Sequence, residues 1–342
     1  MPSYMMYVSI SGEDRIARFA MDPATGALTP RDDVPVQGRP APIAVDPGRR
    51  FLYIGRRNVL QVSSYRIDLK TGALSHIAAT ALENEPCWLA TDRKGKFLLS
   101  AYYLAGAAAV HAIGDNGVVA SPPVQALKTY IGAHCFQTDP SNRFAFVPHI
   151  SGPDRGNVIL QFRFDEATGR LTPNSPDRVS QQEGTGPRHF CFHPSLDAVY
   201  FSNEQGCSVT AYRFDRAKGT LSPFQTVSTL PAGFQGKNSC SKIQISPSGK
   251  FLYAPNRGHN SIACFSVDTS TGSLKPIRQV PSERIPRAFT IDPTGNFLYS
   301  AGFESGRLAS FRINKNTGDL EPMAIYDVGK QPMWVTVIGL AG

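Results

Sequence analysis

Asp292-Pro-Thr-Gly-Asn-Phe-Leu-Tyr299 is the clearest copy of a phrase in which a tight turn leads into a strand. Proline presets the backbone φ of such a turn, glycine supplies its left-handed position, and the residues that follow favour an extended strand. The phrase returns as Asp46-Pro-Gly-Arg-Arg-Phe-Leu-Tyr53 and Ser246-Pro-Ser-Gly-Lys-Phe-Leu-Tyr253, with variant copies that begin at Asp92, Asp139 and His193. It therefore predicts a hairpin that is repeated along the chain.

A second phrase alternates with the first and consists of an aromatic strand end, an acidic residue and a glycine turn. Its copies include Phe19-Ala-Met-Asp22 to Gly26, Tyr65-Arg-Ile-Asp68 to Gly72 and a degenerate one from His111 to Gly117. The seven turn glycines lie 46, 45, 52, 50, 53 and 46 residues apart, at Gly26, Gly72, Gly117, Gly169, Gly219, Gly272 and Gly318. This period is typical of a four-stranded blade of a β-propeller.

The hairpin phrase appears only six times, and the two chain ends supply the seventh copy. Gln331-Pro-Met-Trp-Val-Thr-Val337 resembles the strand before the turn, and Met6-Tyr-Val-Ser-Ile10 resembles the strand after it. Pairing of these strands would hide the sheet edges that an open array exposes. We therefore predict an all-β fold in which residues 1–342 form a single seven-bladed β-propeller of four-stranded antiparallel blades, closed by the N- and C-terminal strands in one blade.

Composition narrows the classes of function. The 342 residues carry a formal charge of +8, but no basic block or basic strip with interleaved aromatic residues accompanies it, so we predict no nucleic-acid partner. No basic leader with an apolar core and no run of about 18 apolar residues is present, so we predict no membrane association. Six cysteines stand singly, without a metal-binding spacing, which predicts reduced thiols in a cytoplasmic protein that needs no cofactor and no metal. Oligomeric state leaves no signal in the sequence.

The repeat also aligns residues that are far apart in the chain. In a propeller blade the first strand lines the central channel and the second runs antiparallel to it. The residue five positions before each turn start is then expected at one channel mouth, a set that comprises Ala41, Cys87, His134, Arg188, Ser241, Arg287 and Met333. The second strands should bring to the same mouth Arg57, Tyr103, Ile150, Glu204, Arg257 and Phe303. Several arginines at one mouth suit a carboxylate or phosphate, because a guanidinium offers a planar fork to either group.

The chain resembles the propeller lactonase family, in particular its bacterial 6-phosphogluconolactonases. The resemblance extends over essentially the whole chain and rests on Gly186-Pro-Arg-His189, Phe192-His-Pro194, Asn203-Glu204, Pro286-Arg-Ala-Phe289 and Gln331-Pro-Met-Trp-Val335. The family also contains carboxymuconate-lactonizing enzymes, whose active-site set resembles the one above. The resemblance implies catalytic roles for His134, Arg188, Glu204 and Arg287. The chain departs from the phosphogluconolactonase pattern at Ala133, where the pattern has cysteine, and in a lengthened loop between Pro148 and Asn157.

The resemblance implies hydrolysis of a small anionic lactone, 6-phospho-D-glucono-1,5-lactone, to 6-phosphogluconate in the pentose phosphate pathway. We expect Glu204 or His134 to act as general base for water, and Arg188 and Arg287 to bind the substrate anion or the developing oxyanion. Arg57 and Arg257 are candidates for the phosphate, and Tyr103 and His189 for further substrate contacts. His193 sits at a turn, where we expect a structural role.

Three alternatives stay open at this stage. One is a lactonizing reaction in which a carboxylate adds across a double bond, and another is hydrolysis of a different aldonic or aldaric acid lactone. The third is a non-catalytic propeller that binds proteins. That class predicts Trp-Asp signatures, whereas Trp88 and Trp334 are the only tryptophans and neither precedes an aspartate.

Overall fold

The computed structural model describes residues 4–341, and its regular secondary structure is almost entirely β-strand. The described chain forms seven antiparallel sheets, each with four strands in its main path, which we number as blades 1 to 7 in chain order. The predicted all-β, seven-bladed propeller with four-stranded blades is confirmed. Contacts between backbone positions divide the chain into two compact units, which are described separately below. That residues 1–342 behave as a single domain stays a prediction.

Unit 1 comprises Met1–Pro35, His189–Phe214 and Leu221–Gly342. Blade 1 contains β29 (Pro332–Gly339), β1 (Tyr4–Ile10), β2 (Arg15–Met21) and β3 (Leu28–Pro35), and the 3-10 turn η1 (Ser11–Glu13) links β1 to β2. Blade 5 contains β16 (Pro187–Phe192), β17 (Ala198–Asn203), β18 (Ser208–Asp215) and β19 (Thr220–Ser228). Blade 6 contains β20 (Ser239–Cys240), β21 (Gln244–Ile245), β22 (Phe251–Arg257), β23 (Ser261–Val267) and β24 (Leu274–Pro281). Blade 7 contains β25 (Pro286–Ile291), β26 (Phe297–Gly302), β27 (Arg307–Ile313) and β28 (Leu320–Asp327).

Unit 2 comprises Val36–Arg188 and Asp215–Thr220. Blade 2 contains β4 (Pro40–Val45), β5 (Phe51–Arg56), β6 (Gln61–Ile67) and β7 (Leu74–Ala81), with the 3-10 turn η2 (Arg57–Val59) between β5 and β6. Blade 3 contains β8 (Trp88–Thr91), β9 (Phe97–Tyr102), β10 (Ala107–Ala112) and β11 (Gln125–Lys128). Blade 4 contains β12 (Gln137–Thr138), β13 (Phe144–Pro148), β14 (Val158–Phe164) and β15 (Leu171–Ser180).

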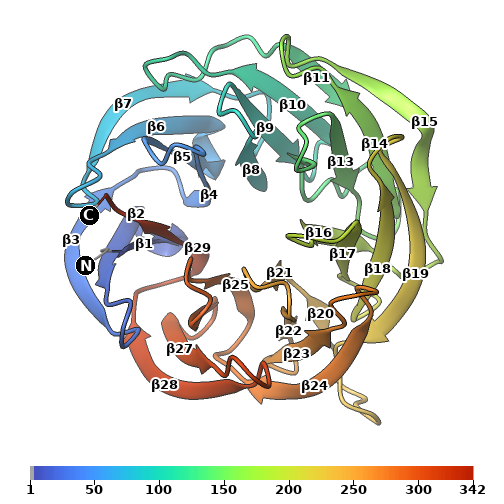
Figure 1. The fold of residues 1–342 in the computed structure, drawn as a ribbon. Helices are drawn as coiled ribbons and strands as arrows, with labels where there is room; N and C mark the ends of the chain where they lie inside the picture. Colours follow the sequence, from blue (N-terminus) through green and yellow to red (C-terminus); the bar gives the residue numbers. More distant parts are fainter. Residues whose placement is uncertain (1–3, 342) are drawn as a thin grey trace. The chain divides into compact units, whose positions relative to one another are not determined.

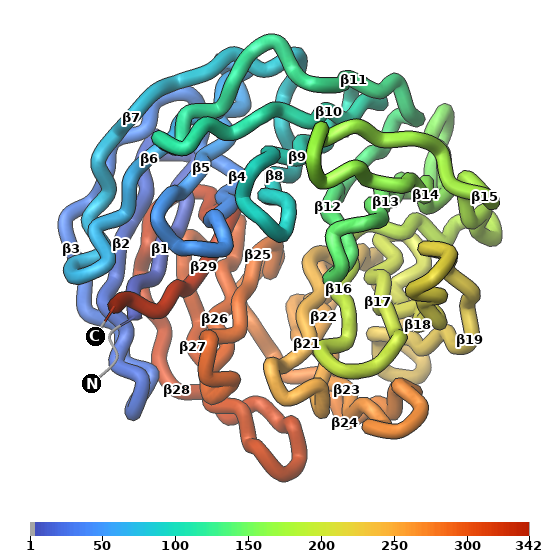
Figure 2. Tube along the Cα trace, turned by 45° about the horizontal axis from the view of Figure 1, so that its top comes forward, coloured from blue at the N-terminus to red at the C-terminus, as the bar shows by residue number. Residues whose placement is uncertain are grey.

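The two chain ends meet in blade 1, as predicted. β1 lies between β29 and β2 in Figures 1 and 2, and it pairs with β29 from Tyr4 opposite Gly339 to Ser9 opposite Trp334. β1 is buried along almost its whole length. The C-terminal strand therefore completes the hydrogen bonding of the N-terminal one.

The two repeated phrases form the contacts between successive blades. In unit 1 the hydroxyl of Tyr253 in blade 6 donates a 2.8 Å hydrogen bond to the carbonyl of Gly318 in blade 7. Tyr299 in blade 7 makes the same bond, at 2.7 Å, to Gly26 in blade 1. Gly318 and Gly26 also lie against the ring that begins the neighbouring hairpin strand, so that a Cβ added at Gly26 would lie 2.5 Å from Phe297. Glycine is therefore needed at these turns both for its positive φ and for its lack of a side chain.

The turn starts are held by their own side chains. The carboxylate of Asp292 accepts hydrogen bonds from the backbone N–H groups of Asn296 and Phe297, at 2.8 and 2.7 Å. In blade 5, Nδ1 of His193 accepts from the N–H groups of Ser195 and Leu196, at 3.1 and 2.9 Å. Its Nε2 lies 3.1 Å from the carbonyl of Gly249, so the ring donates there. The structural role predicted for His193 is thus confirmed.

We expect Gly318→Ala to destabilise the protein more than Gly184→Ala. The two glycines have nearly the same φ, +74° and +75°, but a Cβ at Gly318 would collide with Phe251, whereas nothing lies within 4 Å of one at Gly184. The shared backbone strain costs about 1–2 kcal/mol. The collision adds about 1–3 kcal/mol. Urea unfolding of both variants measures the difference, and equal losses would show that the turn glycine does not lock the blades.

Deletion of residues 331–342 removes β29 and leaves one edge of the buried strand β1 unpaired. We expect the shortened protein to lose cooperative unfolding, whereas a control chain that ends at Gly339 should keep it. Circular dichroism during thermal unfolding measures both. Unchanged cooperativity in the shortened chain would contradict the assignment of β29 to blade 1.

Candidate functional site

The first strand of several blades is irregular at the position that the repeat predicts for the mouth residues. In blade 7 the pairing of β25 with β26 shifts between Pro286 and Ala288, so Arg287 lies in a β-bulge. A similar shift lies at Met333 in β29 and at Ala41 in β4. In blade 6 the strand is split into β20 and β21, and Ser241 begins the gap. A bulge re-aims side chains out of the alternating pattern of a strand, which is why bulges are common beside active sites.

Glu204 and Arg257 form an ion pair between blades 5 and 6. Glu204 follows β17, and Arg257 ends β22. The Arg257 guanidinium lies 3.1 Å from the Glu204 carboxylate, and the side chains of Glu204 and Arg257 are only 16% and 11% exposed. Backbone contacts fix both partners, since Cys240 N–H donates to the Glu204 carbonyl at 3.0 Å and Arg257 donates to the Cys240 carbonyl at 2.7 Å. The alignment of the repeat thus brought together two of the predicted residues that are 53 positions apart.

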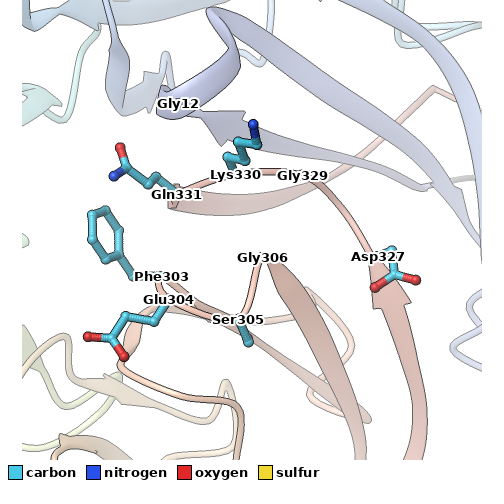
Figure 3. Close-up of a pocket in the computed structure, with 9 residues that line it drawn as sticks. All are labelled: Gly12, Phe303, Glu304, Ser305, Gly306, Asp327, Gly329, Lys330 and Gln331. Carbon is cyan, nitrogen blue, oxygen red and sulfur yellow. The ribbon is translucent and has the colours of Figure 1, made fainter.

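Arg287 and Phe303 meet in blade 7. The Arg287 guanidinium lies over the Phe303 ring, 5.8 Å from its centroid. Phe303 in turn lines a cavity of about 640 Å³ that is built from the 303–306 turn, Gly12, Asp327 and residues 329–331 (Figure 3). This volume is within the range of small-molecule sites. Phe303 therefore contacts Arg287 and also lines the cavity.

A second layer of side chains lies one position further along the first strands of unit 1. His189 and Trp334 are neighbours, with ring centroids 6.4 Å apart. The ammonium of Lys242 lies over the same indole, 4.4 Å from the ring centroid. Lys242 is buried, and the sequence interpretation did not select it. Its position directly after Ser241, a predicted mouth residue, could have drawn attention to it. Burying a charged side chain costs free energy, so a lysine in a first strand indicates a specific role.

Unit 2 holds the other predicted residues. The rings of Tyr103 and His134 pack edge to face with centroids 5.4 Å apart, and Arg155, from the lengthened loop, lies over Tyr103 at 5.5 Å. His134 and Arg188 are buried, at 7% and 2% exposure. Arg57, a candidate for the phosphate, forms an ion pair with Glu85. The structure therefore brings Tyr103 and His134 together within this unit. That the residues of the two units share one mouth stays a prediction of the repeat.

Residues 4–341 contain no group of three or more histidine, cysteine, aspartate or glutamate side chains that is placed to hold a metal ion. Within the same residues no helix is long and apolar enough to cross a membrane.

Comparisons with known proteins agree on one family. Residues 3–337 match the family described as lactonase, seven-bladed β-propeller. The chain is 38% identical to 6-phosphogluconolactonase of Pectobacterium carotovorum over 93% of both proteins, and 34% identical to that of Serratia proteamaculans over 98% of both. It superposes on the periplasmic gluconolactonase of Pseudomonas aeruginosa with a TM-score of 0.90 over 99% of both chains, at 24% identity. This last likeness is one of fold.

His149 makes the stability of the protein depend on pH. Its ring is buried against Tyr130, and burial lowers its pKa from 6.5 to about 4, against a smaller opposing effect of the Val147 and Val158 backbone. As the pH falls, the unfolded chain binds a proton at this histidine before the folded protein does. The contribution of neutral His149 to the free energy of unfolding is therefore fully present above about pH 6.5 and is lost as the pH drops towards 4. The full loss is about 3 kcal/mol.

We expect His149→Phe to flatten this dependence between pH 7 and pH 4.5. Urea unfolding at both pH values measures it, with His76→Gln, a change of an exposed histidine, as the control. If the His149→Phe protein loses as much stability on acidification as the wild type, another group carries the effect.

Proposed function

Because the chain belongs to the lactonase family of seven-bladed β-propellers, we propose that it hydrolyses a sugar-acid lactone, 6-phospho-D-glucono-1,5-lactone, to 6-phosphogluconate. The observation that carries this proposal is the 38% identity to a 6-phosphogluconolactonase over 93% of both chains. The reaction would place the enzyme in the pentose phosphate pathway. The cysteines, which stand singly in the sequence, support a cytoplasmic site of action.

The chemistry needs three kinds of group. Water attacks the carbonyl carbon and loses a proton to a base, the bond between that carbon and the ring oxygen breaks, and the ring oxygen takes up a proton. We assign the base to Glu204 or His134. Glu204 is held in place by Arg257, and His134 is packed against Tyr103, so each is oriented by a neighbour. An oriented base within reach of water contributes a factor of about 10²–10⁴ in rate.

Arg188 and Arg287 are the groups that we assign to the substrate anion or to the developing oxyanion. Arg287 is aimed by its bulge and supported by the Phe303 ring, and Arg188 is almost fully buried. Donors that are fixed before the reaction stabilise developing charge more than mobile ones, because they need no reorganisation. His189, next to Arg188 in β16, supports this arrangement through its contact with Trp334.

We assign Arg57 and Arg257 to binding of the phosphate, although each arginine also has a carboxylate partner. Each is already in an ion pair, with Glu85 and Glu204 respectively. A guanidinium has five N–H donors, so one carboxylate does not exhaust it. Tyr103, which contacts His134, is assigned to substrate contact in unit 2.

Replacement of Glu204 by Gln tests the assignment of the base. We expect kcat for the phosphorylated lactone to fall about 100-fold if Glu204 takes the proton. Initial rates must be corrected for spontaneous hydrolysis. The control is Glu166→Gln, which removes a carboxylate from the exposed ion pair with Lys94 and should leave kcat unchanged.

His134→Asn provides the second arm. Full activity in Glu204→Gln together with a large loss in His134→Asn would assign the base to His134. The substrate is tested on the wild type, with phosphorylated and unphosphorylated lactones compared. Absence of hydrolysis for every lactone would overturn the proposed function.

A further inference from the structure

We propose that the cavity beside Phe303 binds the hydroxyl-bearing carbons of the lactone. This inference rests on the proposed function, because it assumes that the ligand is a sugar derivative. It adds a substrate-binding site and a basis for specificity, and of its lining residues the alignment of the repeat predicted only Phe303.

Three backbone segments of blades 1 and 7 form the cavity. The turn between β26 and β27 is joined to the β28–β29 connection by hydrogen bonds from Val328 N–H and Gly329 N–H to the Gly306 carbonyl, at 3.0 and 3.2 Å. Gly12 N–H donates to the Lys330 carbonyl at 3.1 Å. The cavity of about 640 Å³ is therefore framed by fixed backbone.

Glycine keeps the walls of this cavity bare. A Cβ added at Gly12 would lie 2.9 Å from Lys330, and one at Gly306 would lie 2.9 Å from the Gly329 carbonyl. The backbone segments could not approach so closely with larger residues. The side chains that do line the cavity are consequently few, and each of them bears on its selectivity.

These side chains are suited to a polyol. Phe303 supplies an apolar ring, Glu304 and Asp327 supply carboxylates, and Gln331 supplies an amide. In Figure 3 the side chains of Phe303, Glu304 and Gln331 extend to the same side of the cavity, and Asp327 lies towards the other end. Hydroxyl groups donate to carboxylates, both donate to and accept from an amide, and leave C–H faces that pack on an aromatic ring. A chain of hydroxylated carbons presents all of these features.

The charges at the cavity are balanced. Glu304 and Asp327 supply carboxylates, and Lys330 supplies an ammonium. Glu304 also pairs with Arg284, at 3.0 Å. Neutral hydroxyl groups can bind beside such groups by donating to the carboxylates and accepting from the ammonium.

The cavity also adjoins a proposed catalytic group. Phe303 both lines the cavity and contacts the Arg287 guanidinium, whose centre lies 5.8 Å from the ring centroid. A lactone that places its carbonyl group near Arg287 could therefore extend its hydroxylated carbons past Phe303 into the cavity. This connection makes the cavity a specificity site for the proposed reaction.

The test compares two lactones that differ in their hydroxyl groups. Glucono-1,5-lactone carries hydroxyl groups on its ring carbons and a hydroxymethyl group, whereas δ-valerolactone is the same six-membered ring without these groups. We expect Glu304→Gln to lower kcat/KM for gluconolactone about tenfold, since a charged acceptor of hydroxyl groups is lost. The kcat/KM of the variant for δ-valerolactone should stay within about twofold of the wild-type value, since this substrate has no hydroxyl group to bind Glu304.

Arg284→Gln is the matched control. It breaks the same ion pair but keeps the Glu304 carboxylate, so both lactones should be hydrolysed as by the wild type. Equal losses on the two lactones in Glu304→Gln, or no loss on either, would overturn the inference. A loss on gluconolactone that Arg284→Gln reproduces would also overturn it, because the ion pair and not the carboxylate would then matter.

Binding measurements separate this inference from the proposed function. Titration calorimetry with gluconate and with 5-hydroxyvalerate requires no catalysis. If the wild type hydrolyses no lactone but binds gluconate, and Glu304→Gln loses that binding, the cavity site stands while the proposed function fails. If the wild type binds gluconate no better than 5-hydroxyvalerate, the cavity does not recognise hydroxyl groups and the inference fails.

Discussion

The contact between a turn glycine and the aromatic strand of the neighbouring blade supports the rest of the structure. Tyr253 and Tyr299 each donate a hydrogen bond to the carbonyl of such a glycine, and the glycine lies against the ring that starts the hairpin strand. Each four-stranded sheet has two faces to bury, and within unit 1 these contacts bury faces between blades 6, 7 and 1. The apolar clusters follow the same rule, since residues of blades 6 and 7 form one cluster and residues of blades 7 and 1 form another. Strength between blades thus arises from the repeat itself.

Regular pairing of the two middle strands of blades 6 and 7 accompanies irregular first strands. The bulge at Arg287 and the split between β20 and β21 interrupt the first ladders of blades 7 and 6, whereas β26 with β27 and β22 with β23 pair without a shift. Such interruptions free side chains from alternation and place charged groups, such as Arg287 and the Glu204–Arg257 pair, where a regular strand could not. Burying these charges is costly unless they are paired, which explains why Arg257 also donates to the Cys240 carbonyl.

Particular residues show how much of the candidate site was predictable. The repeat placed Glu204 and Arg257 at equivalent positions, and they meet because equivalent positions of adjacent blades lie at the same height. It assigned Tyr103 to the mouth through a second strand and His134 through a first strand, and their rings are in contact. Lys242 could not be found by this rule, because its place depends on a split strand and on Trp334, which is 92 residues away. The cavity could not be predicted for a similar reason, since the close approach of Gly12, Gly306 and Gly329 has no local sequence signature.

The sequence by itself determined the strands, the turns, the seven blades and the blade shared by the two chain ends. Those features depend on local rules, namely alternation along a strand, the left-handed glycine of a turn and the period of the repeat. Only the tertiary structure decided that Glu204 holds Arg257, that Arg287 rests on Phe303, and that the turns of blades 1 and 7 enclose a cavity. These outcomes depend on bulges and on contacts between residues far apart in the chain. Their geometry is set by how neighbouring blades pack, which no single segment of sequence specifies.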